Sequence, residues 1–323
     1  MDESLKSFKD LRIIFMGTPE FAVASLDALV KAGCNIVAVI TAPDKPAGRG
    51  MKMNESAVKK YAIEKNLSIL QPEKLKDNFF LETLASLQAD VQVVVAFRML
   101  PELVWNMPPL GSINVHASLL PQYRGAAPIN RAVINGEKET GITIFKLQHE
   151  IDTGNILLQE KLLIGDDETA GELHDRMKIT GANLLVKTIK GIAGGNLKEK
   201  TQNNLSTVNG QRSTSLKHAP KIFTDTCKIH WVKDCDEIHN LIRGLSPYPG
   251  AFDFLNDKML KIFRSKKEIA AHHFKTGTVH SDGKTFLKFA CGNGFIHCLE
   301  IQPEGKKKMM VEDFLRGWRG ESI

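Results

Sequence analysis

The hydrophobic residues of the first part of the chain alternate between short apolar runs and helical spacing. Leu11–Met16 is a short apolar run, and after Gly-Thr-Pro the apolar positions recur at helical spacing through Phe21–Val30. The same succession repeats along the chain, with predicted strands at 11–16, 36–41, 68–70, 91–97 and 112–115 and predicted helices at 21–30, 55–65 and 76–87. Strands that alternate with helices predict an α/β fold with a parallel, doubly wound sheet.

The pattern changes after His116. Two further strands, at 141–147 and 155–163, precede a long helix from about 168 to 191, and residues 194–215 have the Gly, Asn, Ser, Thr and Gln content of a linker. Beyond them the sequence predicts a helix at 236–245 and short strands at 251–255, 260–264, 277–280, 285–290 and 295–302. Such strands favour a small β-barrel of the OB type. We therefore expect a first domain at 9–193, a linker at 194–215 and an OB-like domain at 216–323.

The net charge of +6 lies in the last third of the chain. Residues 1–210 contain 24 Lys and Arg and 24 Asp and Glu, whereas residues 211–323 contain 19 and 13. A basic domain beside a neutral one suggests a polyanionic partner, although a solvated surface is the usual explanation for such an excess.

The cysteines and the apolar runs indicate a cytoplasmic protein. Five cysteines without a C-x-x-C pair predict reduced thiols, with no disulfide framework and no zinc knuckle. The acidic first ten residues do not resemble a secretory signal, and no run reaches the ~20 apolar residues that span a bilayer.

The candidate chemistry lies at the end of the predicted strand 112–115. Asn114 and His116 are two residues apart, so their side chains leave an extended strand on the same face, where both could donate to one oxygen. Asp152 follows in the acidic turn Ile151–Gly154 and could orient His116 or accept a proton. Fixed donors beside a carboxylate predict acyl transfer, in which the donors hold a tetrahedral oxyanion.

Other kinds of site match the residues less well. Gly17-Thr-Pro contains one glycine, which favours a tight βα turn over a dinucleotide-binding loop. Ser118 lacks the G-x-S-x-G context of an exposed nucleophile. His116, His149 and Asp152 could form a site of two histidines and one carboxylate, but their spacing matches no standard zinc signature, so no metal is predicted.

Several motifs together resemble the family of folate-dependent formyltransferases and related formyl hydrolases. They are Asn114-Val-His116, Ser118–Pro121, Tyr123-Arg-Gly125 and His149–Gly154. The segments 12–21, 43–50, 305–309 and 314–317 resemble the members that act on charged tRNA, so the resemblance covers nearly the whole chain.

The resemblance implies a Rossmann-like catalytic domain followed by an OB-like domain that helps to hold tRNA. The implied reaction moves the formyl group of 10-formyltetrahydrofolate to the α-amino group of initiator methionyl-tRNA, without a metal and in a monomeric protein. Asn114 and His116 would then hold the oxyanion, and Asp152 would accept the proton of the attacking amine or tune His116 by holding it as an imidazolium. A role for Asp152 as a turn cap stays open.

By the same resemblance, Ser118, Leu119, Leu120 and Pro121 line the folate site. A Leu-Leu-Pro segment would give a rigid apolar wall with free backbone groups.

The loop 42–54 would reach the acceptor end of tRNA. It carries Lys45, Arg49 and Lys52, which suit phosphate contacts. The chain departs from the family pattern at Met51 and Gln122, where many members have a basic residue.

Three alternative functions remain at this stage. A formyltransferase for a sugar nucleotide or a purine precursor would keep Asn114, His116 and Asp152 but would not need the tRNA loop. A hydrolase of 10-formyltetrahydrofolate would share the same three residues. A non-enzymatic OB-type RNA-binding protein would explain the basic domain but not the candidate catalytic residues.

Overall fold

The chain forms two compact units. In this computed structural model the described residues are 7–47, 52–202, 206–208, 211–213 and 215–318. The first unit combines residues 1–125, 141–162 and 175–218, and the second combines 126–140, 163–174 and 219–323. The division at 194–215 expected from the sequence stays a prediction.

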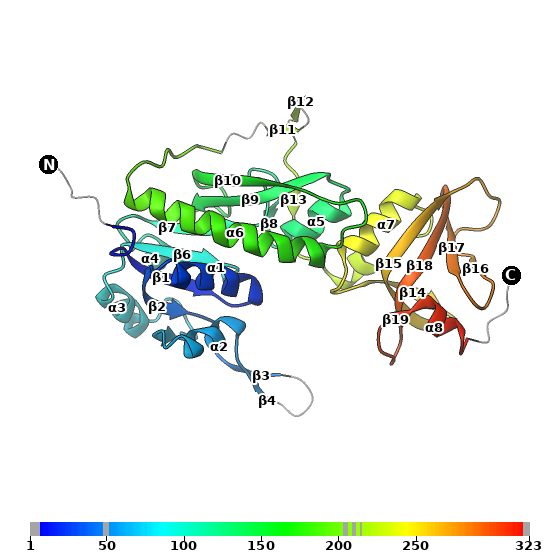
Figure 1. Ribbon diagram of the computed structural model, residues 1–323, viewed down its shortest axis with the longest axis horizontal. Coiled ribbons are helices and arrows are strands. Elements are labelled where there is room, and N and C mark those ends of the chain that lie inside the picture. The colour runs from blue at the N-terminus through cyan, green and yellow to red at the C-terminus, as the bar shows by residue number, and fades with distance from the viewer. Residues whose placement is uncertain (1–6, 48–51, 203–205, 209–210, 214, 319–323) are drawn as a thin grey trace. The chain divides into compact units, whose positions relative to one another are not determined.

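A seven-stranded sheet forms the centre of the first unit, in the order β10-β9-β7-β6-β1-β2-β5 (Figure 1). Its strands are β1 (Arg12–Gly17), β2 (Asn35–Ile40), β5 (Ile69–Leu70), β6 (Val91–Val95), β7 (Ser112–His116), β9 (Glu139–Lys146) and β10 (Ile156–Leu163). β7, β6, β1, β2 and β5 run parallel, and β9 is antiparallel to β7. The expected parallel sheet is confirmed for these five strands, whereas the β9 side is mixed.

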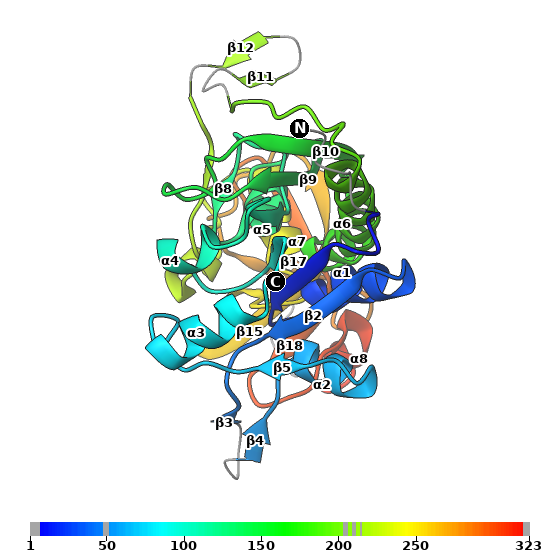
Figure 2. The same ribbon diagram turned by 90° about the vertical axis from the view of Figure 1, so that its left-hand side faces the viewer.

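Helices cover both faces of this sheet. They are α1 (Glu20–Lys31), α2 (Ala57–Glu64), α3 (Asn78–Ser86), α4 (Glu102–Trp105) and α6 (Ala170–Ala193). Figure 2 shows α1 and α6 on one face and α3 and α4 on the other. Ile14 and Met16 of β1 form a buried cluster with Phe80 and Leu84 of α3, as alternation along a strand requires. Burial of apolar area in this cluster stabilises the packing of α3 on the sheet.

Tight turns and short strands connect these elements. A Cβ on Gly17 would lie 2.6 Å from the Cβ of Ala22, so the β1–α1 turn needs glycine, as the sequence indicates. β3 (Lys45–Ala47) and β4 (Lys52–Asn54) form an antiparallel pair. The remaining short strands of the chain are β8 (Arg124–Gly125), β11 (Ser206–Val208), β12 (Gln211–Ser213) and β13 (His218–Ala219).

The second unit contains a six-stranded antiparallel sheet that curls into a half-barrel. Its path is β14-β15-β18-β17-β16, and β19 pairs with β18. The bounds are β14 (Ala251–Leu255), β15 (Lys258–Ile269), β16 (Val279–Ser281), β17 (Leu287–Cys291), β18 (Gly294–Pro303) and β19 (Met309–Met310). Its helices are α5 (Pro128–Ile134), the 3-10 helix η1 (Thr224–Cys227), α7 (Cys235–Gly244) and α8 (Val311–Leu315).

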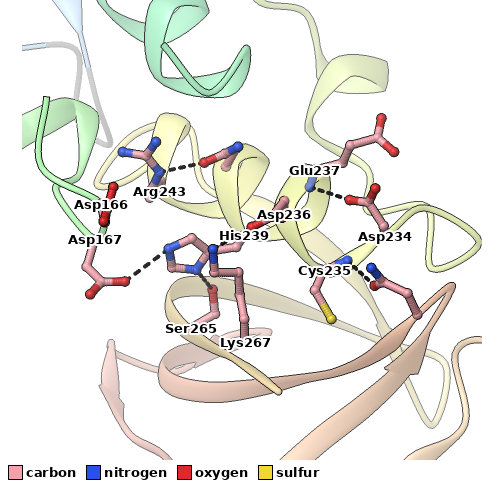
Figure 3. Close-up of polar contacts among 12 residues, drawn as sticks. Asp166, Asp167, Asp234, Cys235, Asp236, Glu237, His239, Arg243, Ser265 and Lys267 are labelled. Atoms are coloured by element: carbon pink, nitrogen blue, oxygen red, sulfur yellow. Dashed lines mark hydrogen bonds and ion pairs between the residues drawn. The ribbon is translucent and has the colours of Figure 1, made fainter. Parts of the chain in front are cut away.

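Polar contacts fix α7 within this unit (Figure 3). Asp234 caps the helix by accepting from the backbone N–H of Glu237 at 2.9 Å. Buried His239 places Nδ1 3.0 Å from Ser265 Oγ and Nε2 3.2 Å from Asp167 Oδ1, the second without hydrogen-bond alignment. Arg243 donates to the carbonyl oxygens of Gly165 and Glu168 at 3.0 Å each. The segment 163–169 is therefore bound to α7.

The structure also settles two simple features of the chain. All five cysteines are free thiols, and the Sγ atoms of Cys235 and Cys291 lie 3.3 Å apart. Within the described residues, no helix combines the length and the apolar character needed to cross a membrane.

Candidate active site

Asn114 and His116 lie in β7, with His116 as the last residue of the strand. Asn114 pairs with Val94 of β6 and with Phe145 of β9, and His116 pairs with Thr143. Side chains two residues apart on a strand share a face, so both belong to one side of the sheet. This edge holds the carboxyl ends of the parallel strands, where α/β sheets bind ligands.

His116 is buried between a carbonyl group and a carboxylate. Its Nε2 lies 2.9 Å from the backbone oxygen of Tyr123, and Nδ1 lies 3.8 Å from Asp152 Oδ2. A carbonyl oxygen only accepts, so Nε2 carries a hydrogen and donates it to Tyr123. The Phe145 ring meets the imidazole edge-on at 6.4 Å and restricts its orientation. The imidazole therefore turns Nδ1 toward Asp152.

Asp152 occupies a tight turn between β9 and β10. Its backbone is left-handed, with φ of 54°, and its Oδ2 accepts from the N–H of Gly125 at 3.0 Å. A Cβ on Gly154 would overlap the carbonyl oxygen of Lys146, so only glycine allows this turn to close. The structure thus brings Asp152 to His116, as the sequence predicts for a shared site.

Asn114 is half-buried, and its amide makes no hydrogen bond with any residue in the described part of the chain. An amide has two N–H donors and a carbonyl acceptor, so this side chain can bond fully to a substrate. Its proposed role as an oxyanion donor stays a prediction.

The segment Ser118–Pro121 is fixed by polar contacts with Thr143 and Gln159. The Thr143 hydroxyl donates to Ser118 O at 2.7 Å and accepts from Leu120 N at 3.0 Å, and Gln159 Nε2 donates to Leu120 O at 2.9 Å. The expectation of free backbone groups along the Leu-Leu-Pro wall is therefore wrong at both backbone groups of Leu120, and also at Leu119 O, which accepts from Gln122 N at 3.1 Å.

The side chains of this segment divide into buried and accessible ones. Ser118 is fully buried, with Oγ donating to Gln122 O at 2.7 Å, and Leu120 packs with Phe145 and Ile156. Leu119 and Pro121 are half-buried. Direct contact with a ligand would therefore come from Leu119 and Pro121, while the other two support them. The assignment of the four residues to a folate site stays a prediction.

Only part of the predicted tRNA-binding loop can be described. Lys45 is exposed at the start of β3, and Lys52 begins β4 and pairs through its backbone with Ala47. Arg49 lies outside the described residues. Lys59 of α2 forms ion pairs with Asp44 and Glu55 across the base of the β3–β4 segment. The contribution of Lys45, Arg49 and Lys52 to tRNA binding stays a prediction.

Gln202 was not identified from the sequence, and Arg124 entered only as part of the Tyr123-Arg-Gly125 motif. Gln202 is 8% exposed, and its amide contacts Arg124 and the backbone of the Asp152 turn. Burial lowers the pKa of Arg124, and the negative charge of Asp152 partly opposes that effect. Gln202 falls in a polar segment without periodicity, so no sequence pattern distinguishes it from linker residues.

A metal would have to use other residues than those considered from the sequence. His149 is exposed, and the described residues contain no group of three or more His, Cys, Asp and Glu side chains that could hold an ion. The roles of Asn114, His116 and Asp152 in catalysis stay predictions.

The chain is similar to known proteins over most of its length. The formyl transferase family model matches residues 11–189, and the model of the formyl transferase C-terminal domain matches residues 221–319. Methionyl-tRNA formyltransferase of Bacteroides thetaiotaomicron is 51% identical over 316 residues, covering 96% of this chain and 97% of the relative. The Flavobacterium johnsoniae protein of the same name is 50% identical over 311 residues, covering 95% and 96%.

Solved structures share the fold at lower identity. An N-formyltransferase from Helicobacter canadensis, in complex with folinic acid and dTDP-3-aminofucose, has a TM-score of 0.65 at 22% identity and covers 93% of this chain and 100% of its own. HypX from Aquifex aeolicus, in complex with tetrahydrofolic acid, has a TM-score of 0.62 at 14% identity, covering 97% of this chain and 49% of its own. At these identities the similarity concerns the fold alone.

Proposed function

The chain belongs to the formyl transferase family, and on this premise we propose that it transfers the formyl group of 10-formyltetrahydrofolate to the α-amino group of initiator methionyl-tRNA. The observation that carries the proposal is an identity of about half of all residues to methionyl-tRNA formyltransferases over 95–96% of the chain. The match includes both the catalytic domain and the C-terminal domain. The family expected from the sequence motifs is thereby confirmed, and the enzyme is a one-carbon transferase.

The reaction begins when the amine nitrogen attacks the formyl carbon. The carbonyl electrons move to oxygen, and the tetrahedral intermediate carries a negative charge that fixed donors must stabilise. We assign this role first to Asn114, because its amide has no partner within the described residues. His116 already donates Nε2–H to Tyr123, so a second bond to the oxyanion would come from protonated Nδ1.

The intermediate then has to lose a proton from nitrogen. An α-amino group titrates near 8, so a fraction of it is already neutral when it attacks, but the nitrogen becomes strongly acidic afterwards. Asp152 is the proposed acceptor, directly or through water. The Oδ2 atom of this carboxylate accepts a hydrogen bond from the N–H of Gly125 and faces His116. The bond between carbon and N10 of the folate breaks, N10 takes up a proton, and formylmethionyl-tRNA and tetrahydrofolate leave.

The remaining parts of the chain fit these two substrates. Half-buried Leu119 and Pro121 would contact the folate, and the segment with Lys45, Arg49 and Lys52 would contact the acceptor end of the tRNA. The curled antiparallel sheet, whose domain carries the basic excess, supports an OB-like assignment and a role in holding tRNA phosphates. Translation initiation would place the protein in the cytoplasm, and we propose that the protein acts as a monomer.

A comparison of acceptors tests the proposal. The protein is mixed with 10-formyltetrahydrofolate and with charged initiator tRNA, free methionine, an amino sugar nucleotide or water alone. We expect formyl transfer to the charged tRNA only. Transfer to the sugar nucleotide, or release of formate without an acceptor, would replace the proposal by one of the other activities of this fold.

A further inference from the structure

Gln202 connects two segments that carry the candidate active site. We infer that it is a positioning residue, which holds the Asp152 turn in its working geometry through contacts to the backbone and to Arg124. The inference rests on the proposed formyl transfer at Asp152. Within the described part of the chain, Gln202 bonds to neither His116 nor the Asp152 carboxylate, so its effect would pass through the turn.

The amide of Gln202 makes four hydrogen bonds. Its Nε2 donates to the carbonyl oxygens of Asp152 at 3.0 Å and Gly154 at 2.8 Å. Its Oε1 accepts from Arg124, from Nη2 at 2.7 Å and from Nε at 3.2 Å. The side chain is nearly buried, so water does not readily replace these bonds.

The chemistry of these partners determines which way the amide faces. Backbone carbonyl oxygens only accept, and a guanidinium only donates, so the NH₂ group must face the turn and the oxygen must face Arg124. A carboxylate at this position would keep the bonds to Arg124 but would set an oxygen against two carbonyl oxygens. Glutamine is therefore suited to this position by hydrogen-bond polarity, independently of its size.

The contacts form a closed ring around Asp152. Arg124 and Gly125 are consecutive: Arg124 holds Gln202, and the N–H of Gly125 holds the Asp152 carboxylate. Gln202 completes the ring by binding the carbonyl of Asp152 itself. Since Asp152 has a left-handed backbone, the direction of its side chain depends on how firmly the turn is held.

The segment that carries Gln202 is itself attached to the sheet. Lys200 and Ile156 exchange two backbone hydrogen bonds of 2.7 and 2.8 Å, and Glu199 accepts from Asn155 at 2.9 Å. Glu199 also pairs with Lys146 at 2.6 Å. Although the composition of this segment predicts a linker, residues 199–202 form part of the support of the site.

Glu199 offers a matched control. It lies three residues before Gln202 and binds the same segment to Asn155 and Lys146. Among the residues that the structure describes, its side chain bonds to none of Asp152, Thr153 and Gly154. Glu199→Gln therefore weakens the attachment of the segment without changing the bonds to Asp152 and Gly154. If the segment had only a structural role, Gln202→Glu and Glu199→Gln would have similar effects on kcat.

The test measures kcat, both KM values and the thermal midpoint of wild type, Gln202→Glu and Glu199→Gln. We expect Gln202→Glu to lower kcat on the order of 10–100-fold, the loss that a small misplacement of a catalytic group causes, with little change in either KM. Glu199→Gln should keep kcat within about 2-fold of the wild-type value, because an exposed ion pair contributes little free energy. Should Gln202→Glu not fold, Gln202→Met, which has a similar length and no charge, carries the same prediction.

Two results would overturn the inference. One is a Gln202 variant with a wild-type kcat and a lower thermal midpoint, and the other is an equal loss of kcat in Glu199→Gln. Failure of the proposed function is a separate result, because it would appear as absence of formyl transfer to charged tRNA by the wild type. The ratio of variant to wild-type kcat can be measured with whichever formyl acceptor the wild type uses.

Discussion

At the scale of single residues, the amide of Asn114 is a donor that makes no hydrogen bond with any described residue. Asn114→Ala removes it without disturbing a hydrogen bond in the described part of the chain. We expect kcat to fall by about 10²–10³, which corresponds to about 3–4 kcal/mol of transition-state stabilisation. Steady-state kinetics and thermal unfolding of the same sample check this. A loss of thermal stability with unchanged kcat would show that the amide is structural.

Asp152 should affect turnover in a different way. Asp152→Asn keeps an oxygen for the N–H of Gly125 but removes the base, so the turn should stay folded while proton transfer fails. We predict a loss of kcat of roughly 10²–10⁴, the range for general acid–base catalysis, with little change in the KM for folate. Single-turnover formyl transfer measures it directly. Near-normal single turnover would leave Asp152 only the role of shaping the turn.

Sequence reasoning reached some of these residues and missed others for a physical reason. Asn114 and His116 stand two apart on a strand, so periodicity alone places them on one face. Gln202 and Asp152 are 50 positions apart in the sequence, and no local pattern indicates a contact over that separation. The bond from His116 to the carbonyl of Tyr123 depends on a backbone with φ of 61° at Tyr123, which the sequence does not reveal.

At the scale of elements, the packing of α5 against α7 depends on one glycine. A Cβ on Gly244 would lie 2.5 Å from Ile134 Cγ1 and 2.9 Å from its backbone nitrogen, and the carbonyl of Gly244 accepts from Asn130 at 2.8 Å. Gly244→Ala should therefore lower the free energy of unfolding by about 1–3 kcal/mol, the usual cost of overpacking. Urea unfolding measures it. Gly317→Ala is the control, since nothing lies within 4 Å of that position, and equal effects would refute the packing argument.

The contribution of His239 in α7 to the stability of the fold should depend on pH. Burial is the main cause that lowers the pKa of His239 below 6.5; Lys267 and Arg243 act in the same direction, and the backbone of Asp166 and the charge of Asp167 oppose it. The unfolded chain then binds a proton that the folded chain does not. The contribution of His239 to stability is therefore complete above about pH 6.5 and decreases as the pH falls below it, by at most about 1.4 kcal/mol per pH unit.

Replacement of His239 tests this pH dependence. His239→Asn retains a polar group for Ser265 and removes the titration, so the slope of unfolding free energy between pH 6.5 and the lowered pKa should become flatter. Urea unfolding at several pH values within this window gives the slope. His230→Asn, at an exposed position, is the control. An unchanged slope in His239→Asn would mean that other groups cause the dependence.

Elements were predicted well where apolar periodicity is strong and poorly where it is not. β6 lies within the predicted strand at 91–97, because all five of its residues are buried. β15 runs over Lys258–Ile269, longer than the predicted 260–264, since its second half carries the charged residues Lys266, Lys267 and Glu268. α5 was not predicted, because seven residues provide too few turns for a helical pattern.

At the scale of the whole molecule, compact units do not follow the linear order of the chain. Segments 126–140 and 163–174 are grouped with 219–323, although they lie within the predicted first domain. Local composition shows where a chain is polar, as in 194–215, but the membership of a unit depends on contacts between distant segments. The family was easier to predict, because the motifs around Asn114 and Asp152 resemble one family. The acceptor was predicted from the segments 12–21, 43–50, 305–309 and 314–317, since the other activities of the family share the same candidate catalytic residues.

The formyl group should end on the amine carried by tRNA, and its position can be measured directly. Isotope-labelled 10-formyltetrahydrofolate is reacted with charged initiator tRNA and the wild-type enzyme, and the tRNA is then digested with nuclease and analysed by mass spectrometry. We predict that the label appears on the α-amino group of the methionine esterified to the terminal adenosine, and that Asp152→Asn reduces its amount by the loss of kcat expected above. Recovery of the label as free formate, or on a different acceptor, would contradict the central claim.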